Sequence, residues 1–373
     1  MPNIDNLGNV LIRSDLNVPI KNGEILDNYR ILKSVEIVQN IIDKSRTITF
    51  VSHMGRPDGK DSKLSLRPVA EKMSEILDKE VHFIEESYGE KVERQIETSE
   101  SKIFLLENLR FEKGETDNDK NFSKLITKPF DSYIFDAFGA AHREHASVVS
   151  FGENLKSFQG PLMDKEIQEL DKLLSNSKSG YSVLLGGAKI SDKLNLIEKL
   201  LPKVENLMVG GGMCFTLLKA LGYEIGKSLL EESFISKAEE LLKSDNGQKI
   251  ILPTDFGVTE SLDSSDRVNI KNSDFKNNHI GVDIGPETVS DFEKILNKSK
   301  NIFWNGPMGI FEKEEFSYGT RKITEAISNL SGYTCIGGGD SVSAINKFSD
   351  KKYFNHISTG GGASLEYLEG KKL

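Results

Sequence analysis

The chain has 373 residues, a length that favours two domains over one continuous core. A hydrophobic content of 37% is ordinary for a globular enzyme, and a net charge of -9 argues against a nucleic-acid partner, which would need a basic surface. No apolar run approaches the ~18 residues of a membrane span, and the N-terminus lacks a signal-peptide pattern. We therefore expect a cytoplasmic protein without a membrane partner, in which Cys214 and Cys335 are reduced thiols.

Short runs rich in β-branched residues alternate with longer segments of helical periodicity along the whole chain. In the first half the runs are NVLIRSDLNVP, TITFVSHMGRP, EVHFI, KIFLLENLRF and SYIFDAFGAAHR. In the second half they are YSVLLGGAK, LMVGGGM, KIILPTDF, NIFWNGPMG, TCIGGGD and HISTGGG. Strands that alternate with helices form parallel sheets covered on both faces. The sequence therefore predicts an α/β fold with two parallel sheets.

The segment 150–174 marks the predicted division between the two domains. It begins with Gly, Ser and Pro signals and continues into a long helical pattern that would connect the domains. We place an N-terminal domain at residues 1–153 and a C-terminal domain at residues 154–373. The most polar segment, 112–124, is predicted to be a solvated loop and the start of a helix.

Charged residues follow the predicted strands of the first half. Ligands of open parallel sheets bind beyond the carboxyl ends of the strands. The residues at these positions, with Arg30 on a nearby segment, are Arg13, Asp15, Asn17, His53, Arg56, Arg110, His142 and Arg143. Any single arginine here could be an ordinary surface residue, but five at the mouth of one sheet favour a binding site. Because guanidinium groups bind carboxylate and phosphate with paired hydrogen bonds, we expect a small ligand with several negative charges.

Glycines follow the predicted strands of the second half, in triplets at 210–212, 337–339 and 360–362. Glycine allows backbone N–H groups to approach a phosphate, and the N-terminus of the next helix favours an anion. A single triplet could equally serve tight packing of a strand against a helix. Three triplets in one half of the chain favour cradles for a nucleotide and its phosphates.

Two lysines and one aspartate add charge to this half. Lys189 and Lys193 are four residues apart and would share a face at the start of a helix, where two cations are unfavourable unless an anion compensates them. A solvated pair is the alternative. Asp340 stands where a helix begins; it is either an ordinary first-turn acid or a carboxylate that holds Mg²⁺ on a nucleotide.

Two nucleotide motifs are ruled out. GYEIGKS, at 222–228, has three residues between its glycines where a P-loop has four, and it follows a predicted helix rather than a strand. No G-x-G-x-x-G is present, which argues against a nicotinamide oxidoreductase.

Eight motifs together resemble those of phosphoglycerate kinases, in the order of that family and over almost the entire chain. They are RSDLNVP (13–19), SHMGRP (52–57), LLENLRF (105–111), DAFGAAHR (136–143), GGAKISDK (186–193), WNGPMGIFE (304–312), GGGDS (337–341) and STGGGAS (358–364). The resemblance implies two doubly wound, Rossmann-like domains whose sheets face across a hinged cleft. It also implies reversible phosphoryl transfer between 1,3-bisphosphoglycerate and MgADP, giving 3-phosphoglycerate and MgATP, by a monomer.

The resemblance also implies a role for each matching residue. The phosphoglycerate site would comprise Asp15, Asn17, Arg30, His53, Arg56, Arg110 and Arg143. The nucleotide site would comprise Gly187, Ala188, Lys189, Lys193, Gly211, Asn305, Pro307, Glu312, Gly338, Gly339, Asp340 and Ser341, with Asp340 as the Mg²⁺ ligand. The residues that act on the transferring group would be Arg30, Lys189, Lys193, Gly338 and Gly361.

Three departures from the family pattern stand out. Ser14 replaces a usual valine and Ala140 a usual threonine, and we expect small effects because neither removes a charge. The sequence stops at EGKKL, where the family continues with a tail that returns to the first domain, so we expect altered coupling at the hinge. A non-catalytic relative that serves as a scaffold is the alternative function, although Arg30, Lys189 and Asp340 are all present.

Overall fold

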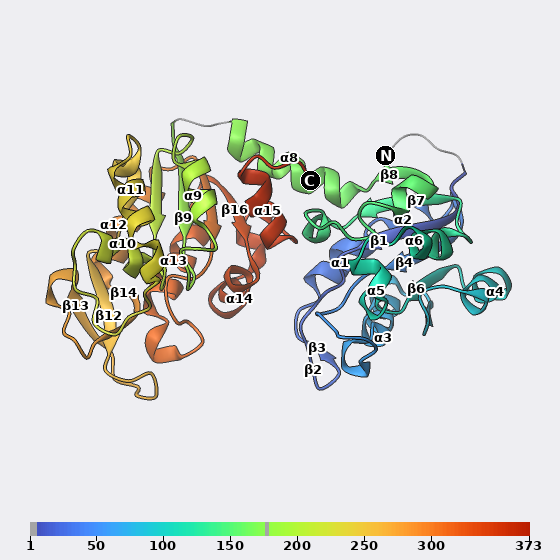
Figure 1. The fold of residues 1–373 in the computed structure, drawn as a ribbon, viewed down its shortest axis with the longest axis horizontal. Coiled ribbons are helices and arrows are strands. Elements are labelled where there is room, and N and C mark those ends of the chain that lie inside the picture. The colour runs from blue at the N-terminus through green and yellow to red at the C-terminus, as the bar shows by residue number, and fades with distance from the viewer. Residues whose placement is uncertain (1–5, 176–178) are drawn as a thin grey trace. The chain divides into compact units, whose positions relative to one another are not determined.

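The computed structural model describes residues 6–175 and 179–373 (Figure 1). The chain divides into two compact units, Met1–Ile167 and Gln168–Leu373. The sequence analysis places the division earlier, after residue 153. Strand β8 (Lys156–Gln159) accounts for the difference, because it pairs with β7 (Ser132–Asp136) and so extends the first sheet. Helix α8 (Pro161–Ser175) crosses the division.

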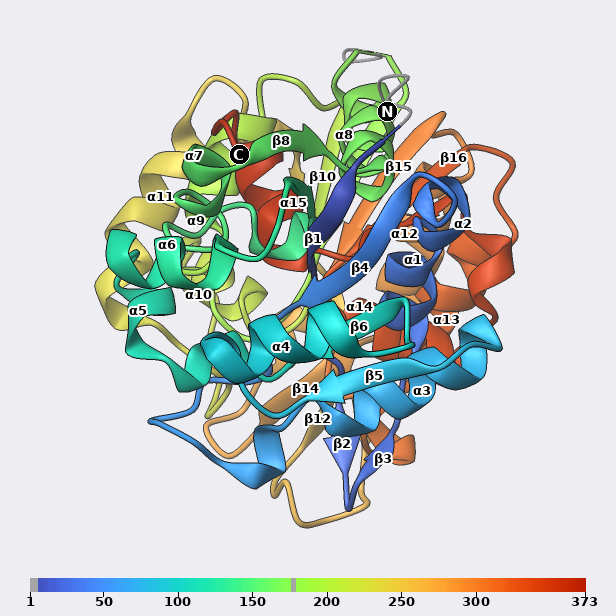
Figure 2. The ribbon, with the colours of Figure 1, turned by 90° about the vertical axis from the view of Figure 1, so that its right-hand side faces the viewer.

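The first unit is built on a six-stranded sheet in the order β5-β6-β4-β1-β7-β8, with every neighbouring pair parallel. Figure 2 shows β1 and β4 side by side in this sheet. Its other strands are β1 (Gly8–Ser14), β4 (Ser45–Val51), β5 (Val81–Ile84) and β6 (Ile103–Leu106). Its helices are α1 (Tyr29–Val35), α2 (Val38–Ile41), α3 (Arg67–Leu77), α4 (Glu90–Thr98), α5 (Lys113–Thr116), α6 (Lys120–Thr127) and α7 (Phe151–Asn154).

Both faces of this sheet are buried. Along β1, Val10 and Ile12 belong to one apolar core, whereas Leu11 belongs to the other. Successive side chains of a strand point to opposite faces, so a strand that is apolar at every position must be covered on both sides. This explains why the predicted strands read as continuous apolar runs rather than as alternating patterns.

The second unit repeats the plan with the strand order β11-β10-β9-β15-β16-β17, again with parallel neighbours only. Its strands are β9 (Tyr181–Leu185), β10 (Asn206–Val209), β11 (Ile250–Ile251), β15 (Asn301–Asn305), β16 (Tyr333–Gly337) and β17 (His356–Ile357). Its helices are α9 (Leu194–Leu200), α10 (Cys214–Ala220), α11 (Ile235–Lys243), α12 (Pro286–Leu296), α13 (Tyr318–Ser328), α14 (Gly339–Phe348) and α15 (Gly361–Leu368). The chain order reverses direction between β9 and β15, which makes their carboxyl ends the favoured binding edge.

The prediction of an α/β fold with two parallel sheets is confirmed, and each predicted run contains a strand. The sequence did not reveal an antiparallel sheet of β12 (Asp255–Thr259), β13 (Val268–Lys271) and β14 (Ile280–Ile284), or the hairpin of β2 (Ile20–Lys21) and β3 (Glu24–Ile25). The run KIILPTDF contains β11 and the start of β12, which are separated around Pro253 because proline cannot donate to a sheet ladder.

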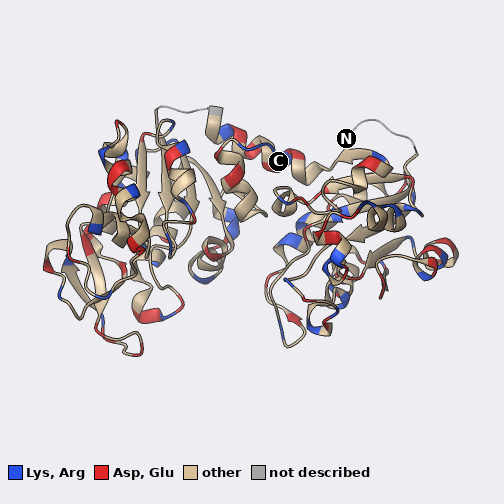
Figure 3. Cartoon of the chain, viewed as in Figure 1, with Lys and Arg blue, Asp and Glu red and all other residues tan. Residues whose placement is uncertain are grey.

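Charges are distributed over both units. Figure 3 shows Lys and Arg interspersed with Asp and Glu along the ribbons. Within residues 6–175 and 179–373, no helix is both long and apolar enough to cross a bilayer.

Candidate functional site

The charged residues predicted for the first site follow the strands of the first sheet. Asp15 comes directly after β1, and His53 lies two residues beyond β4. Arg110 lies in a 3₁₀ turn, Leu109–Phe111, beyond β6, and Arg143 follows β7. Because the strands are parallel, all these positions fall on the same edge of the sheet.

Arg30 is tied to Asp15 and Asn17 by direct contacts. Its Nη1 lies 3.2 Å from Oδ2 of Asp15 and donates to the backbone oxygen of Asn17 at 2.8 Å. The side-chain oxygen of Asn17 accepts the backbone N–H of Gly55 at 3.0 Å, next to Arg56. The Arg30 side chain is nevertheless 30% exposed, so its guanidinium is held in place and accessible to a ligand.

Three of the predicted arginines line one pocket. Arg56, Arg110 and Arg143 lie on the wall of a cavity of about 580 Å³, together with Lys113 and His145. Asp15, Asn17, Arg30 and His53 are not among the residues that line it. The site therefore has a cationic pocket and, at the same edge of the sheet, a second group of residues centred on Arg30.

Burial and repulsion from neighbouring arginines destabilise the charged form of Arg110. Burial, followed by the charges of Arg143 and Arg13, lowers the pKa of Arg110 to about 10, so it is still a cation at neutral pH. The Nε of Arg110 is buried without a hydrogen-bond partner. Buried cations with an open donor favour an anion as ligand, since an anion removes both penalties.

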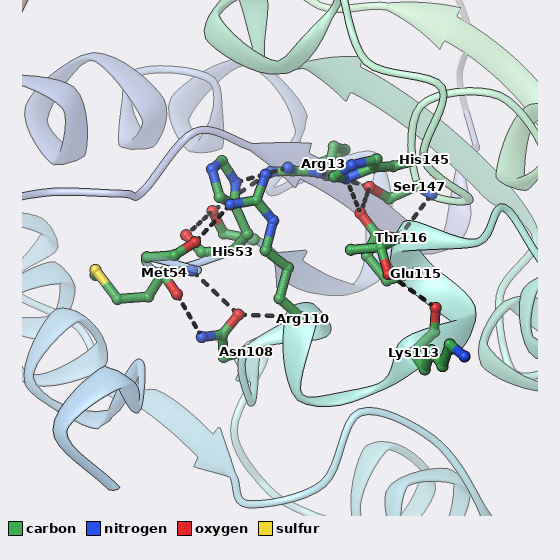
Figure 4. Close-up of polar contacts among 12 residues, drawn as sticks. Arg13, His53, Met54, Asn108, Arg110, Lys113, Glu115, Thr116, His145 and Ser147 are labelled. Atoms are coloured by element: carbon green, nitrogen blue, oxygen red, sulfur yellow. Dashed lines mark hydrogen bonds and ion pairs between the residues drawn. The ribbon is translucent and has the colours of Figure 1, made fainter. Parts of the chain in front are cut away.

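The fifth arginine, Arg13, is not placed as the sequence analysis expected. It is fully buried rather than at the mouth of the pocket, and its side chain contacts Ser147 and His53 (Figure 4). Sequence reasoning also missed Glu115, which lies in the segment predicted to be solvated but is fully buried. Its partner Ser147 comes 32 residues later, and no local pattern marks such a pair.

The second unit has its own pocket at the carboxyl ends of β9, β10 and β15. It measures about 400 Å³. The predicted residues that line it are Gly187, Ala188, Gly211, Pro307, Glu312 and Asp340. Phe215, Phe256 and Val282 add apolar surface to the same wall. Backbone at one part and aromatic side chains at another suit a ligand with phosphates and a flat base.

Glycine is required at this pocket because the loops touch through their backbones. Gly211 has a φ of +67°, and a Cβ there would lie 2.6 Å from the backbone of Gly187. A Cβ on Gly361 would lie 2.6 Å from the Cα of Gly338. Each of the three glycine triplets follows a strand and precedes a helix, as predicted: β10 and α10, β16 and α14, β17 and α15.

Four of the remaining predicted residues lie at the end of β15 or at the start of α14. Ser341 accepts the backbone N–H of Gly306 at 2.7 Å through its Oγ, and Asn305 ends β15. Gly338 and Gly339 begin α14, and a Cβ on Gly339 would meet nothing within 4 Å. None of these four residues is among those that line the pocket.

Lys193 reaches the carbonyl groups at the ends of β9 and β15. Its Nζ donates to the backbone oxygens of Gly186 and Asn305, the latter at 2.9 Å. Burial lowers the pKa of Lys193 to about 8, against the opposing effect of Asp340 and Asp192. An anion bound next to Lys193 would therefore stabilise its charged form and raise its pKa.

The expectation that Lys189 and Lys193 share a helix face is wrong. Helix α9 begins at Leu194, with Lys193 as its N-cap residue. A turn precedes it, in which the N–H of Lys193 donates to the oxygen of Ile190 at 3.0 Å. Lys189 lies before that turn and is exposed, two residues after Gly187, whose φ is +104°.

Asp340 is the one predicted metal ligand. It is exposed in the first turn of α14 and lines the pocket of the second unit. No group of three or more His, Cys, Asp or Glu that could hold a metal occurs in the part of the chain that the structure describes. A single carboxylate fits Mg²⁺, which is commonly held by one or two carboxylates, the phosphates of a substrate and water.

The chain is similar to known proteins over nearly its whole length. Residues 5–371 match the family model described as phosphoglycerate kinase. The phosphoglycerate kinase of Dictyoglomus turgidum is 46% identical over 369 residues, covering 98% of this chain and 93% of that protein. The phosphoglycerate kinase of Thermosipho africanus is 44% identical over 375 residues, covering 98% and 93%.

Two solved structures are similar over the same extent. The phosphoglycerate kinase of Coxiella burnetii has a TM-score of 0.85 and 36% identity, covering all of this chain and 95% of that one. The phosphoglycerate kinase of Pyrococcus horikoshii has a TM-score of 0.87 and 30% identity, covering 99% and 95%.

Proposed function

The chain belongs to the phosphoglycerate kinase family, and we propose from this that it transfers a phosphoryl group between 1,3-bisphosphoglycerate and MgADP, giving 3-phosphoglycerate and MgATP in glycolysis. The observation that supports this most is the division of chemistry between the two pockets. One is lined by three arginines, and the other by glycine backbone and aromatic rings.

The first unit would bind the phosphoglycerate. Arg56, Arg110 and Arg143 would neutralise its negative groups, because guanidinium groups match carboxylate and phosphate oxygens in geometry as well as charge. Asp15 and Asn17 would hold Arg30 in its orientation through the contacts described above. His53 would donate a hydrogen bond to the same ligand.

The second unit would bind the nucleotide. Phe215 and Phe256 would pack against the base, and the backbone of Gly187, Ala188 and Gly211 would lie along the ligand. Pro307 and Glu312 line the same pocket, while Asn305, Gly338, Gly339 and Ser341 would contribute from positions outside its lining. Mg²⁺, which we propose as the cofactor, would be held by Asp340 and would neutralise phosphate charge.

The transfer itself would need positioning and charge rather than a nucleophile of the protein. In the direction of ATP consumption, a carboxylate oxygen of 3-phosphoglycerate attacks the γ-phosphorus, the bond to the β,γ-bridging oxygen breaks, and ADP leaves with that electron pair. Arg30, Lys189 and Lys193 would stabilise charge on the moving phosphoryl group, with the N–H groups of Gly338 and Gly361 at the starts of α14 and α15.

These residues belong to different units, with Arg30 in the first and Lys189 and Lys193 in the second. We therefore include hinge closure in the proposal: the site is complete only when both ligands bring the two units together, which also excludes water from the acyl phosphate. The proposal extends to a monomer acting in the cytoplasm.

A coupled assay with 3-phosphoglycerate and MgATP tests the proposal. We expect formation of 1,3-bisphosphoglycerate, abolished by chelation of Mg²⁺ and strongly reduced in Asp340→Asn. The matched control is Asp350→Asn, an exposed carboxylate in the same unit that caps a short turn. Absence of product from folded protein, under conditions in which another phosphoglycerate kinase is active, would leave a non-catalytic scaffold as the function.

A further inference from the structure

A chain of buried polar contacts lies behind the first site, centred on Arg13 (Figure 4). Its Nε donates to Oγ of Ser147 at 2.9 Å, its Nη1 donates to the backbone oxygen of Ser14, and its Nη2 lies 2.9 Å from Nδ1 of His53. The Arg13 side chain is fully buried and is not among the residues that line the cationic pocket. Its guanidinium is therefore occupied by the protein rather than placed to touch a ligand.

Glu115 supplies the opposite charge through a shared serine. Its Oε1 accepts the hydroxyl of Ser147 at 2.7 Å and its Oε2 accepts the backbone N–H of Ser147 at 2.9 Å. Burial by itself raises the pKa of the Glu115 carboxyl, but the hydrogen bond from His145, the charge of Arg13 and the bonds from Ser147 together lower it below its ordinary value. The Ser147 hydroxyl thus accepts from the Arg13 guanidinium and donates to the Glu115 carboxylate, and so connects the two buried groups.

The contact between Arg13 and His53 determines which ring nitrogen of His53 carries the proton. A guanidinium has five N–H donors and no acceptor, so Nδ1 of His53 must present its lone pair to Arg13. Burial, then the charges of Arg13, Arg110, Arg143 and Arg30, hold the pKa of His53 well below its usual range. The ring is therefore neutral at physiological pH, and a neutral imidazole has one N–H, which must be on Nε2.

We infer that Arg13 is a positioning residue that holds His53 as the neutral Nε2–H tautomer, so that His53 presents a hydrogen-bond donor to an anionic ligand of the first site. The nature of that ligand, a phosphoglycerate, rests on the proposed function. The opposite tautomer would turn a lone pair toward the oxygens of the ligand and repel them. A protonated ring would add one more charge beside several arginines.

The first test measures the tautomer in the unmodified full-length protein. Histidine labelled with ¹⁵N, without ligand, is followed by long-range ¹H–¹⁵N correlation from pH 6 to 8, and the His53 signals are identified by their loss in His53→Gln. We expect an unprotonated Nδ1 and a protonated Nε2 throughout this range. A proton on Nδ1, or titration of the ring above pH 6, would overturn the inference without the need for any Arg13 variant.

Variants then connect the tautomer to binding. Arg13→Met should give a mixture of tautomers and raise the KM for 3-phosphoglycerate about tenfold or more, with the KM for MgATP unchanged. Arg46→Met is the matched control: this arginine is exposed, donates to Asn9 on the same sheet, and should change neither measurement. If Arg13→Met does not fold, Ser147→Ala replaces it, and a smaller effect of the same kind is expected. An unchanged tautomer and KM in a folded variant would refute the role.

A final arm separates this inference from the proposed function. Addition of 3-phosphoglycerate to the unmodified protein should shift the Nε2–H signal of His53. If the protein is an active kinase and that signal does not move, the donor role is wrong and the function stands. If the tautomer is as inferred but no phosphoglycerate binds and no kinase activity is found, the proposed function fails and the effect of Arg13 on His53 stands.

Discussion

Each unit has a candidate half-site, by which we mean the binding site at the carboxyl ends of its own parallel strands. The two half-sites lie at corresponding positions on similar sheets, but different kinds of groups line them. At the edge of the first sheet, charged side chains from the segments after several strands line the candidate site, including Arg56, Arg110 and Arg143. At the edge of the second, backbone and apolar surface dominate, with Gly187, Gly211 and Phe256 on the pocket wall. One fold thus supports recognition by charge and recognition by close approach, and the two should fail in different ways. Binding at the first half-site should be weakened when a charged side chain is removed, and binding at the second when a side chain is added to a glycine.

The largest effect should come from removing charge at Arg30. We expect Arg30→Ala to lower kcat by about 10²–10³-fold, as for other preorganised donors, because it would act on charge that develops only during transfer. Steady-state kinetics with both substrates measure this. Arg67→Ala is the control, since Arg67 is an exposed arginine of the same unit that pairs with Glu85 and lies over the ring of Phe83. A raised KM with unchanged kcat would make Arg30 a binding residue alone.

An added atom should damage the second half-site. Gly211→Ala forces a side chain into a left-handed backbone and places its Cβ 2.6 Å from Gly187. Gly222→Ala has a similar φ, +88°, but its Cβ meets nothing within 4 Å. We expect Gly222→Ala to cost about 1–2 kcal/mol of stability and leave nucleotide binding unchanged.

Gly211→Ala should cost more stability than this and raise the KM for MgATP, because the backbone contact is lost as well. Denaturant unfolding and nucleotide titration distinguish the two effects. Equal behaviour of the two variants would show that conformation, and not close approach, accounts for the glycine at 211.

The pH dependence of the two half-sites should also differ. The pKa of Lys193 lies near 8 without an anion, so this lysine loses its charge as the pH rises above 8. Phosphate would restore the pKa, so nucleotide binding takes up a proton at alkaline pH. Affinity for MgATP should therefore fall about tenfold between pH 7 and pH 9, equivalent to ~1.4 kcal/mol.

Affinity for 3-phosphoglycerate should stay level over this range, because the pKa of Arg110 is about 10 and that of His53 lies well below 6.5. Calorimetry in buffers of different ionisation enthalpy measures the protons taken up. Lys193→Met should remove the pH dependence of nucleotide binding, and its persistence in that variant would assign it to another group.

The smallest effect concerns polar groups beneath the first site. Thr47 and Thr49 are both buried in β4. The hydroxyl of Thr47 donates to Oδ1 of Asn9 at 2.9 Å, whereas that of Thr49 is buried without a partner. Thr49→Val should therefore raise the free energy of unfolding by up to about 1 kcal/mol, and Thr47→Val should lower it by about as much. Denaturant unfolding measures both, and the same sign for the two variants would contradict the pairing.

The parts of the molecule that the sequence predicted are those encoded locally. Apolar runs followed by charged residues or glycines identified the strands and the edge at which the pockets lie, because a strand and the loop after it are adjacent in sequence. The residues that were missed depend on partners far along the chain. In sequence Glu115 has the pattern of a solvated acid, whereas in the structure it is buried beside Ser147 and Arg13. Lys193 has helical spacing with Lys189, but a turn from Ile190 to Lys193 separates Lys189 from the helix.

The pairing register has a consequence for synthesis of the chain on the ribosome. In the first sheet Val10 of β1 pairs with Ser132, which is 122 residues later, and in the second Tyr181 of β9 pairs with Asn301, 120 residues later. At elongation rates of about 5–20 residues per second, one edge of β1 and of β9 has no strand to pair with for about 6–24 seconds. Open apolar edges are sites of aggregation, so each unit is most vulnerable before this partner strand has been made. We expect the emerging chain to depend most on chaperones in two separate intervals, before β7 and before β15.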